Sequence, residues 1–136
     1  MDAEVIRSPD VADGLRVFLA SLNPGLEVTA GSTPPNFAEQ SVSVKRTGGY
    51  KRDLVTDMAQ VLVEARDRNS EAAAEALMCT IDAQIYAGER EGAMGPLTVH
   101  MVKTFAGPYL NPDPSNPQIY RCSATYQLAV RMTTAS

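Results

Sequence analysis

The sequence predicts an α+β fold: an antiparallel or mixed sheet of about four to five strands with helices packed on one face. Two segments repeat apolar residues at helical spacing, and others alternate apolar and polar residues with the period of a strand. Hydrophobic residues make up 44% and charged residues 21% of the 136 residues, so the chain can bury a core of its own. A chain of this length suits one domain, which we expect to span residues 1–136.

The first helix is expected to start at Ser8-Pro9-Asp10, where Ser8 offers an N-cap hydroxyl and Asp10 a carboxylate near the positive helix end. One apolar stripe follows at helical spacing: Val11, Leu15, Phe18, Leu19 and Leu22. Asn23-Pro24-Gly25 should end the helix. A short strand is expected at Leu26–Ala30, followed by a loop over residues 31–36.

A hairpin is predicted next. Ser41–Val44 alternates with period two and enters the basic segment Lys45–Arg52, where Gly48 and Gly49 can take positive φ and reverse the chain. Ala59–Ala65 alternates in the same way and forms the returning strand. The sequence therefore predicts a hairpin with a basic tip.

The second helix has the clearer signals. Ser70 is the expected N-cap, and apolar residues follow on one face: Ala74, Leu77, Met78, Ile81 and Ile85. Gly88 is the expected C-terminal stop. Alanines in the first turns favour close packing of this helix on the sheet.

Two further strands are expected, at Leu97–Phe105 and Gln118–Met132. Between them, the segment from Gly107 to Pro117 contains four prolines, which bar both a helix and a central strand. Long irregular loops of this kind are often interaction surfaces.

Composition limits the function. The net charge of −4 and the pI of 4.9 argue against a protein that holds nucleic acid by diffuse phosphate attraction. No run is apolar and long enough to span a membrane, and Met1–Arg7 has no leader features. Cys79 and Cys122 are expected to be buried, reduced thiols, and with His100 as the one histidine we expect no metal site.

No catalytic constellation is predicted. Gly48-Gly49 lacks the surroundings of a phosphate-binding loop, and His100 has no patterned nucleophile beside it. The carboxylates of Asp53, Asp57, Glu64 and Asp67 alternate with lysines and arginines as on an ordinary solvated surface. We therefore expect no catalytic residue, no cofactor and no small-molecule substrate.

The basic cluster Lys45, Arg46, Lys51 and Arg52, with Tyr50 among them, is the local anomaly in this acidic chain. Three interpretations stay open, in this order: a hairpin tip kept soluble by charge, a docking site for an acidic partner, and a contact with nucleic-acid phosphates.

The order of these segments resembles the tail terminator, or tail completion, proteins of long-tailed bacteriophages, particularly those that infect actinobacteria. The resemblance covers nearly the whole chain and rests on the order and spacing of short motifs. These are Val42–Gly49 (VSVKRTGG), Leu54–Asp57 (LVTD), the strand Gln60–Ala65, the alanine-rich helix, Gly107-Pro108, Pro112-Asp113 and Pro117–Tyr120 (PQIY) before a long final strand.

The resemblance implies a subunit of a homohexameric ring at the head-proximal end of the tail tube. Such a ring ends tube polymerisation and joins the head, so its partners are itself, the major tail tube protein and a neck or head-completion protein. Whether DNA contacts the ring lumen stays open. Its place is the virion, at the head–tail interface, after assembly in the host cytoplasm, and no membrane is involved.

The interface candidates lie in the hairpin tip and in the proline-rich loop. They are Lys45, Arg46, Tyr50, Lys51, Arg52, Tyr109, Leu110 and Asp113. Two other functions stay open: a neck or head-completion connector, and a small nucleic-acid-binding module that uses the basic hairpin.

Overall fold

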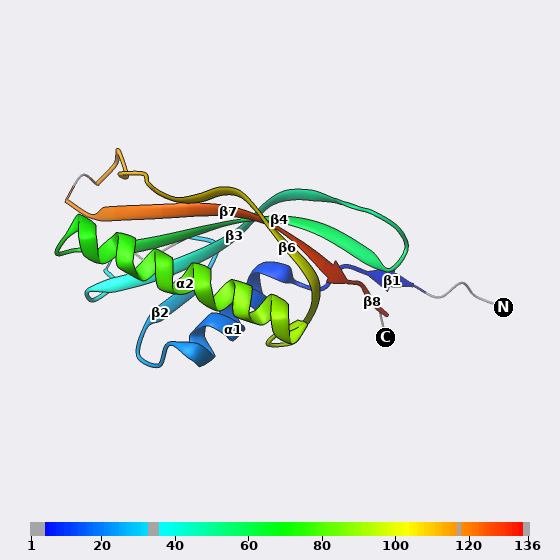
Figure 1. The fold of residues 1–136 in the computed structure, drawn as a ribbon. Coiled ribbons are helices and arrows are strands. Elements are labelled where there is room, and N and C mark those ends of the chain that lie inside the picture. The colour runs from blue at the N-terminus through cyan, green and yellow to red at the C-terminus, as the bar shows by residue number, and fades with distance from the viewer. Residues whose placement is uncertain (1–4, 33–35, 117, 135–136) are drawn as a thin grey trace.

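A computed structural model describes residues 5–32, 36–116 and 118–134 of the chain (Figure 1). The elements in chain order are β1 (Ile6–Arg7), α1 (Val11–Leu22), β2 (Glu27–Ala30), β3 (Gln40–Lys51), β4 (Thr56–Asp67), α2 (Glu71–Glu91), β5 (Ala93–Met94), β6 (Leu97–Leu110), β7 (Tyr120–Arg131) and β8 (Thr133–Thr134). Residues 33–35 of the expected loop, residues 1–4 and Pro117 lie outside the described residues.

The main sheet has six strands in the order β2-β3-β4-β7-β6-β5, and β1 pairs with β8 in a separate two-stranded sheet. Only β2 and β3 pair in parallel among the described strands, so the α+β class and the mixed sheet are confirmed. The expected count of four to five strands is wrong. A two-residue strand such as β5 forms because its neighbour β6 is already in place, and it is too short to have a detectable period.

Helix α1 has its N-cap at Asp10 and not at Ser8. The Asp10 Oδ1 atom accepts the backbone N–H of Asp13 at 3.1 Å, whereas the Ser8 hydroxyl donates to the Met132 sulfur at 3.3 Å. The Ser8 hydroxyl thus contacts the carboxyl-terminal segment and does not cap the helix. The helix ends at Asn23 as predicted, and strand β2 lies within the predicted Leu26–Ala30.

The hairpin is longer than predicted, and its turn is elsewhere. Strands β3 and β4 pair from Gln40 opposite Asp67 to Lys51 opposite Asp57, so the chain reverses at residues 52–55. Gly48 and Gly49 lie inside β3, next to a register shift that makes the strand bulge. A Cβ on Gly49, at φ 120°, would lie 2.1 Å from the carbonyl oxygen of Met58. The glycine therefore permits a close approach of two backbones and does not form the turn.

Helix α2 begins as predicted and ends one turn later. The Ser70 hydroxyl accepts the Ala73 N–H at 3.0 Å, which confirms the N-cap. Gly92, in the left-handed conformation at φ 79°, ends the helix. Gly88 is buried inside the helix, where a Cβ would meet Met94 at 2.7 Å and Phe18 at 3.0 Å, so close packing requires this glycine.

Strand β6 continues past the predicted end at Phe105, through Gly107 and Pro108, to Leu110. Its pairing with β7 shifts register between Thr104 and Ala106 and again between Ala106 and Tyr109. The second shift tolerates Pro108 because a bulged strand does not need every backbone N–H. The irregular loop is therefore shorter than predicted and begins at Asn111.

The core lies between the helices and the sheet. Helix α2 contacts β4, β6 and β7, and α1 contacts β2 and β3. The predicted stripe of α2 is buried at Ala74, Met78, Ile81 and Ile85, whereas Leu77 is half-buried. In the described part of the chain, neither helix combines the length and the apolar character needed to cross a membrane.

The two cysteines differ in environment. Cys122 on β7 is fully buried as predicted, and burial raises the pKa of its thiol. Cys79 is exposed, which contradicts the prediction. Its position on α2 follows the buried Met78 by one residue, about 100° around the helix, and so faces away from the core.

Candidate interaction surfaces

The hairpin tip observed in the structure is residues 50–55 and not the predicted segment Lys45–Arg52. It lies at one end of the molecule, beside β1 and the carboxyl-terminal strand (Figure 1). Its apolar side chains are strongly exposed: 58% for Tyr50, 81% for Leu54 and 52% for Val55. The backbone of the turn is ordered by local hydrogen bonds. Arg52 N–H donates to the Thr56 carbonyl at 3.0 Å, and Val55 N–H donates to the Asp53 carboxylate at 2.9 Å. The tip thus presents apolar groups on a well-defined turn.

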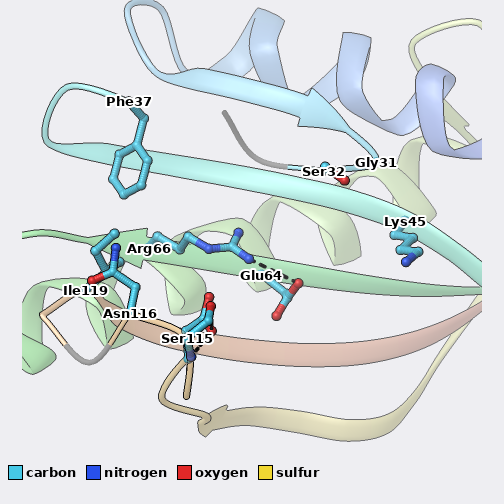
Figure 2. Close-up of a pocket in the computed structure, with 10 residues that line it drawn as sticks. Gly31, Ser32, Phe37, Lys45, Glu64, Arg66, Ser115, Asn116 and Ile119 are labelled. Atoms are coloured by element: carbon cyan, nitrogen blue, oxygen red, sulfur yellow. Dashed lines mark hydrogen bonds and ion pairs between the residues drawn. The ribbon is translucent and has the colours of Figure 1, made fainter. Parts of the chain in front are cut away.

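The basic cluster is not one patch. Lys51 and Arg52 are exposed at the hairpin tip, and Arg52 lies 3.6 Å from the carboxylate of Asp53. Lys45 is exposed further back along β3, where it lines a polar pocket (Figure 2). Arg46 is engaged within the fold, so three of the four cations remain at the surface.

Arg46 forms a two-point ion pair with Asp57. Its Nη1 lies 2.6 Å from Asp57 Oδ2, and its Nη2 lies 2.8 Å from Asp57 Oδ1. The Asp57 side chain is only 1% exposed, and that of Arg46 is 32% exposed. Burial alone would raise the pKa of Asp57, but the hydrogen bonds and the charge of Arg46 lower it on balance. The same contact raises the pKa of Arg46. Arg46 is therefore a structural residue of the hairpin.

A polar pocket of about 360 Å³ lies on the sheet between β3 and the loop that precedes β7 (Figure 2). Glu64 is its central acid, since its two carboxylate oxygens lie 3.4 Å from Arg66 and 3.2 Å from Arg121. Arg66 also donates to the Ser43 hydroxyl at 3.0 Å. The charges of this pocket are thus largely balanced within the fold.

Residues 111–115 of the loop before β7 are fixed to this network. Arg121 donates to the Asn111 carbonyl at 2.7 Å and lies 3.7 Å from the carboxylate of Asp113. Asp113 in turn accepts the Ser115 hydroxyl at 2.7 Å and the Ser115 N–H at 3.0 Å, and these bonds lower its pKa. Asp113 is half-buried and holds the loop in shape. These contacts give residues 111–115 a defined conformation beside β7.

An apolar pocket of about 170 Å³ lies at the same end as this loop. Its apolar lining is Leu110, Pro112, Ile119 and Tyr120, and its polar neighbours are Glu71 and Arg121. Leu110 is 41% exposed and Tyr120 is 38% exposed, while Tyr109 beside them is 40% exposed. Of the predicted interface residues, Leu110 lines this pocket, whereas Tyr109, its neighbour in β6, is exposed but is not part of the lining.

The candidate surfaces also contain Leu54, Glu71 and Tyr120, which the sequence did not predict as interface residues. The pair Leu54-Val55, directly after a run of charged residues, was the available signal, because an apolar pair in a hairpin turn has no core to enter. The apolar pocket could not be predicted from the sequence. Glu71, Leu110 and Tyr120 meet only through the pairing of β7 with β4 and β6.

The four carboxylates of the sequence analysis do not converge. Asp57 binds Arg46, Glu64 binds Arg66 and Arg121, and Asp67 accepts the N–H groups of Asn69 at 2.6 Å and Ser70 at 2.9 Å. Asp53 serves the hairpin turn. Among the described residues, no three His, Cys, Asp or Glu side chains are grouped to hold a metal ion.

Comparison with known proteins gives little. No protein-family model matches the chain, and no curated protein shows significant similarity to it. Among solved structures, the chain is similar to a component of the virion of a native gene transfer agent particle. The identity is 11% and the TM-score 0.46, over 90% of this chain and 86% of that chain. A likeness of this size assigns neither a family nor a function.

Proposed function

We propose that this chain is a non-enzymatic structural protein of a phage-like virion that acts as a tail terminator. One subunit, residues 1–136, assembles with its copies into a ring, which we take to be hexameric. The ring caps the tail tube, ends its polymerisation and offers its other face to a neck or head-completion protein. No cofactor and no small-molecule substrate take part.

The observation that carries the proposal is the placement of two exposed surfaces at opposite ends of one sheet. The hairpin tip with Leu54 lies at one end, and the loop with Leu110 and Tyr120 lies at the other (Figure 1). A ring subunit needs two different side surfaces that fit each other. The resemblance of the motif order to tail terminators supports the same function.

The proposed mechanism is geometric. One face of the ring matches the last ring of the tube, and the other face lacks the features that would recruit another tube subunit. Because the loop and the hairpin turn are held by their own hydrogen bonds, both can present a preformed surface.

The test is electron microscopy of tail tubes polymerised with and without the purified protein. The proposal predicts rings at tube ends and shorter tubes as more protein is added. A protein that leaves tube length unchanged and never binds tube ends contradicts it. Binding to neck proteins alone would then favour the connector function, and salt-sensitive binding to DNA would favour the nucleic-acid module.

A further inference from the structure

We infer that the subunits associate head to tail, with Leu54 of one copy seated in the apolar pocket of the next copy. This inference rests on the proposed function, because it names the contact between neighbouring subunits of the ring. The pocket meant is the one lined by Leu110, Pro112, Ile119 and Tyr120.

Leu54 is suited to be the inserted side chain. At 81% exposure it has the largest exposed fraction among the large hydrophobic residues described. It stands on a turn whose backbone is fixed by the bonds of Arg52 and Asp53, so little conformational entropy is lost when it binds. Apolar anchors of this kind dominate the affinity of many interfaces.

The pocket suits one such side chain. Its volume of about 170 Å³ can take a leucine but leaves no room for a large ligand. Leu110 and Tyr120 on its wall remain 41% and 38% exposed, so a partner can remove apolar surface from water on both sides.

The charges around the two surfaces are complementary. Lys51 and Arg52 flank the inserted segment and are exposed, and Arg52 lies 3.6 Å from the carboxylate of Asp53. The exposed Glu71 lies on the pocket, whose other charged residue, Arg121, is already paired with Glu64 and Asp113. Opposite charges at the edge of an apolar contact favour this partner over unrelated ones and set its orientation. A second copy of the chain supplies both surfaces.

The two surfaces cannot meet within one molecule. Strand β7 runs from Tyr120, opposite Asp67 beside the pocket, to Arg131, opposite Thr56 beside the hairpin tip. Twelve residues of strand place the two ends roughly 36 Å apart. A contact between two different patches is heterologous, and repeated heterologous contacts close into a ring when the rotation permits.

Strand pairing between subunits at the free edge of β6 is a less suitable mode of association. The Glu89 carboxylate already accepts the Val102 N–H at 2.5 Å, and the strand is bulged at several points. Both features protect a sheet edge against pairing with another chain. The association therefore relies on side chains.

Site-directed crosslinking tests the contact. In a Cys79→Ser background, Leu54→Cys protein is mixed at high concentration with a mass-tagged Leu110→Cys protein and exposed to mild oxidant. We expect disulfide-linked dimers of one tagged and one untagged chain. The matched control pairs Leu54→Cys with Ala83→Cys, an exposed position on α2. Equal yields for the two pairs would overturn the inference.

A mixing experiment tests the polarity of the contact. Leu54→Asp destroys the inserted side chain, and Leu110→Arg destroys the pocket, so neither variant should assemble alone. Each variant keeps the surface that the other lacks, and their mixture should therefore form dimers but no larger species. Circular dichroism first verifies that both variants are folded. Assembly of Leu54→Asp alone at wild-type affinity would overturn the inference, since loss of a buried leucine should weaken association on the order of tenfold or more.

The two proposals fail separately. If the wild-type protein caps tubes while the crosslink is absent, the tail terminator function stands and this contact is wrong. If the crosslink forms but tubes are never capped, the subunits associate as inferred and the proposed function falls.

Discussion

Arg46 and Asp57 lie eleven residues apart in sequence and form a two-point ion pair across the β3–β4 hairpin, with distances of 2.6 and 2.8 Å. The pair holds Arg46, one residue of the basic cluster, against the buried carboxylate of Asp57. It also links the two strands of the hairpin that carries Leu54.

Arg46→Ala should lower the free energy of unfolding by about 2 kcal/mol, because it removes the two-point ion pair of the buried Asp57 carboxylate. Urea denaturation of both proteins measures the difference. Lys45→Ala is the matched control on the same strand and should stay within about 0.5 kcal/mol of the wild type, because Lys45 is exposed. Equal stability of the Arg46 variant and the control would contradict the structural function of the pair.

Stability should also depend on pH through Asp57. Its pKa in the folded protein is lowered from the ordinary value of about 3.9. The unfolded chain therefore takes up the proton first, and the stabilisation is complete above about pH 4 and lost as the pH falls through the folded pKa. Denaturation between neutral pH and acid should show this fall. In Asp57→Asn the fall should be shallower over the same window, and an unchanged slope would show that other groups govern it.

Thiol labelling distinguishes the two cysteines. Cys79 is exposed and Cys122 is buried, so the native protein should react quickly at one thiol and the unfolded protein at two. Cys79→Ser should abolish the fast reaction. Fast labelling of two thiols in the native state would mean that β7 is not buried as described.

The fold was predictable where local signals and packing agree. Ser70 caps α2 and the stripe from Ala74 to Ile85 faces the core, because helix capping and helical periodicity act within a few residues. The alternation of β4 and β7 was readable for the same reason.

The prediction failed where distant pairing overrode a local preference. Gly48-Gly49 suits a turn, yet the pairing of the twelve-residue strands β3 and β4 places both glycines in a bulged strand. Pro108 suggests a loop but lies in a bulged stretch of β6. Arg46 looked like a free cation because its partner Asp57 becomes adjacent only once the hairpin register is set. The apolar pocket depends on three strands and had no local signal.

Charge reversal at the hairpin tip tests its part in assembly. Lys51→Glu with Arg52→Glu should weaken self-association while the free energy of unfolding changes by about 0.5 kcal/mol or less, because both side chains are exposed. Arg46 must be left in place, since its reversal would also break the pair with Asp57. Arg90→Glu with Lys103→Glu alters net charge equally at exposed positions elsewhere and should leave association unchanged. Equal effects of the two double variants would point to net charge alone.

The most direct measurement is the mass of the purified protein in solution over a range of concentrations, repeated after tail tubes are added. We predict a closed oligomer of defined size, six copies in our proposal, either free in solution or on tube ends. A protein that remains monomeric at every concentration, both alone and with tubes, would contradict the ring and the function built on it.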